Sequence, residues 1–160
     1  MTLILAPTDI VLNVARPFIG TREIGPNAGQ IVEMFLKFVG LKKGDPWCAA
    51  AVSWIGHAGL GEKWPVVKTG GCAVLGEWAE QHGVLVKEPQ VGDIVLYWHA
   101  SLGRFAHTGL VEQLLTGPKP LQALEGNTND DGSRDGWGYL RKTRAIGTRD
   151  RFIRWTEMLA

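Results

Sequence analysis

Residues 91–98, VGDIVLYW, predict a turn followed by a buried strand, and here the chain changes from helical to extended patterns. Before this point, apolar residues recur at helical spacing in the segments 6–19, 30–39, 45–59 and 72–82. After it, short apolar segments predict further strands at 107–112, 121–125, 139–143 and 152–155. Helices followed by consecutive short strands are typical of an α+β fold in which helices pack on an antiparallel sheet.

Length and composition favour one ordinary globular domain spanning residues 1–160. Apolar residues make up 45% of the 160 residues and charged residues 21%, and we find no linker or repeat. The net charge of +1 lacks the basic excess of a nucleic-acid-binding protein. The apolar start, Leu3–Ala6, has no preceding basic region and is interrupted at Pro7, so we expect neither a signal peptide nor a membrane span.

Cys48 lies where a helix is expected to begin. Asp45 is a favourable N-cap residue and Pro46 suits the first helical position, which places Cys48 in the first turn. By the same rule, Thr8 is expected to cap the first helix of the chain. The N–H groups and partial positive charge of a first turn favour a thiolate, and they also stabilise an oxyanion. Cys48 is therefore a candidate nucleophile, the alternative being a buried core cysteine, which is our expectation for Cys72.

Four histidines are candidates for the base that such a nucleophile needs. His57 lies nine positions after Cys48 on the same expected helix and cannot reach it, and His82 fits a helix C-terminus. His99 ends one expected strand, whereas His107 begins the next and is followed by the small residues Thr108 and Gly109. We therefore place His107 ahead of His99 as the base.

A third polar residue usually orients a catalytic histidine. Glu125 and Asn127 lie at the end of the expected strand that follows the one of His107, two positions apart, so a regular strand would point both to one face. Either residue could reach His107, and the alternative is that both belong to a turn, since GNTNDDG is a strong turn sequence.

These motifs, in the order DPWCAAAVSW, VGDIVLY, HTGLVE and LEGNTN, resemble the CHAP amidase/peptidase family, which is related to the NlpC-type cell-wall peptidases. The resemblance spans about residues 22–144. It implies a papain-like fold with about five to six strands, Cys48 as nucleophile and His107 as base. Glu125 and Asn127 match the family's remaining polar positions, and which of them orients His107 stays open.

The resemblance also implies a substrate, which is peptidoglycan cleaved at an amide bond, either between sugar and peptide or within the peptide. Such a reaction needs no cofactor. The segment GLKKGDP before Cys48 has two lysines and a single aspartate where some family members carry an Asp-rich calcium loop, so we expect no metal there. We further expect a monomer, made in the cytoplasm and acting on the cell wall. A holin or secretion system would deliver it, and an immunity protein would be a further partner.

Several weaker hypotheses accompany this interpretation. Asp45 and Trp47 flank the helix start and are candidates for contacts with the oxyanion or the substrate. In the segment GSRDGWG, Arg134 could contact a peptide carboxylate and Trp137 could stack on a sugar, although a solvated turn is the simpler explanation. Residues 127–132 imitate half of a calcium-binding loop but lack the acidic twelfth residue. The competing functions are an inactive wall-binding module and a cysteine protease that acts on proteins.

Overall fold

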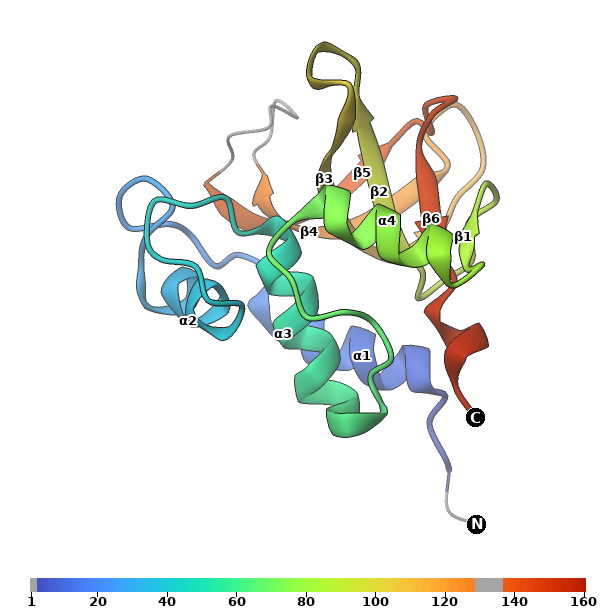
Figure 1. Ribbon diagram of the computed structural model, residues 1–160, viewed down its shortest axis with the longest axis horizontal. Coiled ribbons are helices and arrows are strands. Elements are labelled where there is room, and N and C mark those ends of the chain that lie inside the picture. The colour runs from blue at the N-terminus through green and yellow to red at the C-terminus, as the bar shows by residue number, and fades with distance from the viewer. Residues whose placement is uncertain (1–2, 129–136) are drawn as a thin grey trace.

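The computed structural model describes residues 3–128 and 137–160 and confirms the α+β class and the antiparallel sheet (Figure 1). The described residues form four α-helices, which are α1 (Pro7–Ala15), α2 (Gln30–Phe38), α3 (Cys48–Leu60) and α4 (Cys72–Gln81). The strands are β1 (Leu85–Val86), β2 (Ile94–His99), β3 (Arg104–Leu114), β4 (Leu121–Thr128), β5 (Gly138–Arg144) and β6 (Arg151–Ile153). They form one sheet in the order β1-β6-β2-β3-β4-β5.

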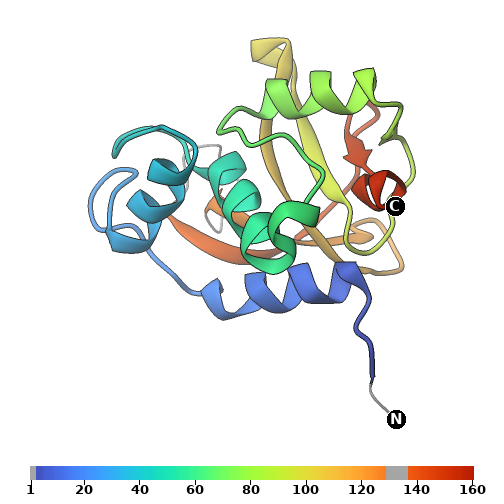
Figure 2. The same cartoon turned by 60° about the horizontal axis from the view of Figure 1, so that its bottom comes forward.

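Helix α3 is the centre of the helical layer. It packs against α1, α2, β3 and β4, with α1 and α2 on different sides of it, while α4 contacts β3 and β1 (Figure 2). Because α3 has neighbours on several sides, eight of its thirteen residues are buried. This explains the nearly uninterrupted apolar sequence after Cys48.

Two helix starts differ from their predictions. Ala6 is the N-cap of α1 with Pro7 at the first helical position, so Thr8 lies inside the helix and is not its cap. Helix α3 begins at Cys48 with Trp47 as N-cap, and Asp45 is not the cap. Instead, the Asp45 carboxylate accepts a hydrogen bond from the Lys42 N–H at 3.0 Å and closes the preceding turn. Cys48 is consequently the first helical residue and lies next to the helix's unpaired N–H groups.

The strands also differ from the predictions in three places. Strand β3 begins at Arg104, ahead of His107, and the two-residue strand β1 was not predicted. The last strand ends at Ile153, and Trp155 belongs to a 3-10 helix, Trp155–Met158. Trp155 is fully buried, so it fills the core from a helical position.

Two glycines let the layers approach closely enough to build a site between them. A Cβ atom at Gly126 of β4 would lie 2.6 Å from Cζ3 of Trp47, the residue before α3. A Cβ atom at Gly76 of α4 would lie 2.8 Å from the Phe105 ring on β3. The start of α3 and the middle of α4 are therefore held against the central strands by contacts that a larger residue would obstruct.

Within residues 3–128 and 137–160, no helix combines the length and the apolar character that crossing a bilayer requires.

Candidate active site

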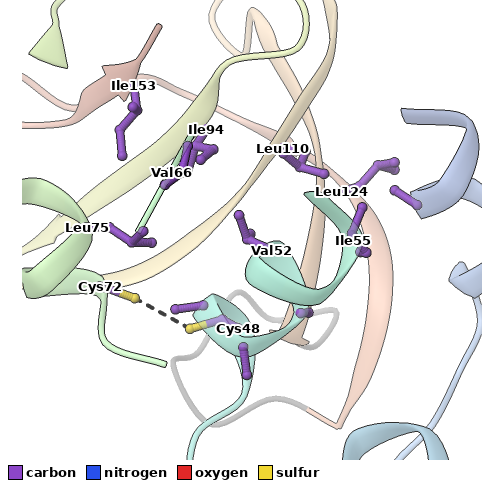
Figure 3. Packing of buried hydrophobic residues seen from close by; sticks show 14 of the residues in the cluster. Cys48, Val52, Ile55, Val66, Cys72, Leu75, Ile94, Leu110, Leu124 and Ile153 are labelled. Carbon is purple, nitrogen blue, oxygen red and sulfur yellow. Dashed lines mark hydrogen bonds between the residues drawn. The ribbon is translucent and has the colours of Figure 1, made fainter. Parts of the chain in front are cut away.

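The thiol of Cys48 lies at the junction of two helices. Cys48 begins α3 and Cys72 begins α4, and their sulfur atoms are 3.6 Å apart (Figure 3). The two residues are not joined by a disulfide, and each is buried, with exposed fractions of 4% and 6%. Two helix starts, each with unpaired N–H groups, thus converge on one pair of sulfurs.

His107 lies on β3 directly opposite Tyr97 of β2. The two rings stack at a centroid distance of 5.6 Å and an interplanar angle of 17°. The His107 Nε2 atom is hydrogen-bonded to Oε1 of Glu125 at 2.7 Å. Its Nδ1 atom is buried and makes no aligned hydrogen bond within the described residues, so it is the ring nitrogen left to exchange a proton with Cys48.

Glu125 is fully buried on β4, yet three side chains satisfy its carboxylate. Besides His107, the Tyr97 hydroxyl donates to Oε2 at 2.7 Å. Arg144 of β5 donates from Nη2 to Oε1 at 2.6 Å and from Nε to Oε2 at 2.8 Å. Burial alone would raise the pKa of Glu125, but His107 and Arg144 outweigh it and lower that pKa to about 2. Glu125 is therefore a stable carboxylate that orients the His107 ring.

The pKa values of Cys48 and His107 shift in opposite directions. A hydrogen bond with Cys72 is the main cause that lowers the pKa of Cys48 well below its usual value. It outweighs burial and is assisted by His107 and the Ala49 N–H. Burial opposes the charged form of His107, but the Glu125 carboxylate, its hydrogen bond to the ring and the neighbouring Cys48 thiol raise the pKa of His107 to about 9. Together these shifts favour a thiolate–imidazolium pair at neutral pH.

Asn127 does not share the position of Glu125. The pairing of β4 with β5 is irregular between Glu125 and Thr128, and Asn127 has a left-handed backbone with φ of 53°. This irregularity breaks the alternation that would have placed both side chains on one face. Asn127 is 2% exposed, and within the described residues its Oδ1 atom has no hydrogen-bond partner. Glu125, not Asn127, makes the contact with His107.

The other candidates occupy separate environments. The Trp47 side chain is fully buried, with its ring 6.1 Å from that of Phe35 and its Nε1 atom donating to Glu23 at 2.8 Å. One face of Trp137 is covered by the Arg22 guanidinium, 4.2 Å from the ring centroid. Arg134 lies outside the described residues, as does most of the calcium-like loop.

The remaining histidines have local partners. His57 contacts the Ser53 carbonyl at 2.8 Å, His82 the Trp78 carbonyl at 2.7 Å, and His99 the Ser101 hydroxyl at 2.9 Å. Among the described residues, no group of three His, Cys, Asp or Glu side chains is arranged to hold a metal ion.

Sequence reasoning missed three members of the site, which are Tyr97, Arg144 and Cys72. Each has an ordinary local context, namely a strand tyrosine, a strand-end arginine and a cysteine in an apolar helix. Only the register of the sheet and the packing of α4 bring them to Glu125 and Cys48. A signal did exist for Cys72, because its two preceding glycines, Gly70 and Gly71, mark a close turn into a helix.

No protein-family model matches this chain, and neither a curated protein nor a solved structure matches it significantly.

Proposed function

We propose that this protein is a cysteine hydrolase that cleaves an amide bond in the peptide part of bacterial peptidoglycan. One observation carries the proposal: a thiol at the first position of a buried helix lies beside a histidine that a clamped carboxylate orients. The four sequence motifs that resemble the CHAP amidase/peptidase family contain the same residues in order. That resemblance supports peptidoglycan as the substrate and a papain-like arrangement of the fold.

The proposed reaction is acyl transfer through a thioester. The Cys48 thiolate attacks the amide carbonyl, and unpaired N–H groups of the first turn of α3 stabilise the oxyanion. The His107 imidazolium gives its proton to the leaving amine and then removes one from the water that hydrolyses the thioester. Glu125 holds Nε2 of His107 throughout, so that Nδ1 stays directed at the sulfur. These steps use side chains and backbone of this chain alone.

The intact set of reacting groups favours an enzyme over a module that only binds the wall. A binding module would have no use for a thiol with a lowered pKa beside a buried, fully satisfied carboxylate. The enzyme would act on the cell wall, where a holin or secretion system would deliver it.

The deciding experiment is digestion of purified peptidoglycan, followed by mass spectrometry of the released fragments. We expect soluble fragments with new amino and carboxyl ends and no new reducing sugar ends. Cys48→Ala should abolish the release and leave the fold intact, because alanine is a good helix former. The masses of the fragments would identify which amide is cut.

Three results would contradict the proposal in different ways. Release by Cys48→Ala would exclude the thiol mechanism. Hydrolysis of casein without any action on walls would indicate a protease for protein substrates. Sedimentation with walls without soluble products would indicate a binding module.

A further inference from the structure

The second cysteine of the chain lies against the proposed nucleophile. The Sγ atoms of Cys48 and Cys72 are 3.6 Å apart and point toward one another from the starts of α3 and α4 (Figure 3). A disulfide needs a separation of about 2.05 Å, so the sulfurs would have to approach by about 1.5 Å. Small rotations about the side-chain bonds or a slight shift of one helix start would achieve this.

The approach of the two cysteines is fixed by a second contact between the same segments. The buried Ser53 hydroxyl on α3 donates to the Thr69 carbonyl at 2.9 Å and accepts from the Thr69 N–H at 3.1 Å. The Thr69 hydroxyl in turn accepts from the Gly71 N–H at 3.1 Å, immediately before Cys72. The loop that leads into α4 is thereby held to α3, which keeps the two sulfurs adjacent.

We propose that Cys72 is a resolving cysteine that forms a reversible disulfide with Cys48 when a hydroperoxide oxidises the site. The proposal rests on the function proposed above for its effect on activity, whereas the disulfide itself needs no substrate to be detected. Cys48 lies beside a histidine and two helix starts, an environment that favours the thiolate and therefore oxidation.

The chemistry takes two balanced steps. The Cys48 thiolate attacks the peroxide O–O bond, which gives a sulfenic acid on Cys48 and releases an alcohol, or water when the oxidant is hydrogen peroxide. The Cys72 thiol then attacks the sulfenic sulfur, so that the S–S bond forms and the hydroxyl leaves as water. A dithiol reductant reverses the result by thiol–disulfide exchange and is itself oxidised to a disulfide.

The disulfide would switch hydrolysis off and protect the nucleophile. It removes the thiolate that attacks the substrate, so activity stops while the protein is oxidised. It also consumes the sulfenic acid before further peroxide converts it irreversibly to sulfinic acid. Reduction then restores both thiols.

The test exposes the whole protein to a small excess of hydrogen peroxide, blocks remaining thiols and maps peptides without reduction. We expect a linked peptide pair containing Cys48 and Cys72 in monomeric protein, and its loss after dithiothreitol. Wall-lytic activity should fall with peroxide and return with dithiothreitol. After the same treatment with peroxide and dithiothreitol, the Cys72→Ser variant should regain a fraction of its own untreated activity that is at least about tenfold smaller than the fraction the native protein regains. It should also carry sulfinic acid on Cys48.

The proposal would be overturned if the native protein gained oxygen on Cys48 without a linked peptide, or if the link formed only between molecules. Recovery of Cys72→Ser equal to that of the native protein would also overturn it. Peptide mapping of the native protein decides the matter even if the variant fails to fold. If the linked peptide forms but the protein does not lyse walls, the proposed disulfide is supported and the proposed peptidoglycan hydrolase activity is refuted.

Discussion

The Arg144 guanidinium contacts both carboxylate oxygens of Glu125, with hydrogen bonds of 2.6 to 3.1 Å from Nε and Nη2. Glu125 is fully buried, so this arginine compensates a charge that water does not reach. Arg144 also lies over the Tyr97 ring, 4.8 Å from its centroid. The arginine, the tyrosine and the carboxylate thus form one rigid support behind His107.

Arg144→Met should reduce wall lysis by about tenfold or more, because the carboxylate that orients His107 loses its bidentate arginine partner. The rate at which iodoacetamide alkylates Cys48 should fall as well, and Arg144→Lys should restore part of both rates. Arg141→Met is the matched control, since Arg141 lies on the same strand and pairs with Glu112. Equal losses in the two variants would show that Arg144 has only a general structural role.

His107→Ala should eliminate turnover, whereas His99→Ala should retain it. The His99 ring contacts Ser101 near the β2–β3 turn, while His107 contacts the carboxylate that orients it and lies beside Cys48. Lysis of purified walls and circular dichroism of both variants provide the measurement. If His99→Ala lost activity and His107→Ala retained it, His99 would be the base.

The pH profile of lysis should be flat near neutrality and fall as the pH rises through about 9, where the raised pKa of His107 lies. Above that value the imidazolium loses the proton that the leaving amine needs. Glu125→Gln removes the carboxylate charge that raises this pKa. The alkaline limb should therefore move to lower pH by about one to two units.

Glu112→Gln is the control for the pH experiment, because the Glu112 carboxylate pairs with Arg16 and Arg141. Its alkaline limb should stay in place. An unchanged alkaline limb in Glu125→Gln would mean that the pairing of His107 with Glu125 does not govern the pH dependence of lysis.

Gly126→Ala should destabilise the protein by about 1–3 kcal/mol, because the new Cβ atom would overlap the buried Trp47 ring. It should also reduce activity by displacing the start of α3. Gly59→Ala is the matched control, since its Cβ atom would meet only ordinary contacts at 3.5 Å and alanine favours the helix. Urea denaturation of both variants tests the difference, and equal midpoints would contradict the close approach.

Local patterns in the sequence were enough to predict the order of the four α-helices and of every described strand except β1. The segment around Phe35 predicts a helix because its buried residues repeat every three to four positions. The segment around Trp54 is apolar almost throughout, as expected for a helix that is buried on several sides. The helix starts were less predictable, because Asp45 hydrogen-bonds to the turn before it and does not cap α3. An aspartate side chain can either cap a helix or close a turn, and the path of the backbone around it decides which of the two it does.

The site was predictable in part, for a similar reason. Cys48, His107 and Glu125 could be selected because their residue types and order suit one chemistry. The choice between Glu125 and Asn127 depends on an irregularity of β4 that no periodic pattern reveals. Arg144 and Cys72 reach the site through long-range packing, which a linear sequence does not display.

Cys48 and Cys72 belong to helices of the first half of the chain, whereas His107 and the residues that support it belong to strands of the second half. During translation the thiols therefore leave the ribosome first, followed by the imidazole, the carboxylate and finally the guanidinium of Arg144. A nascent chain that ends before β5 contains Cys48 but still lacks Arg144. The order of synthesis thus delays the reactive state until the sheet is nearly finished.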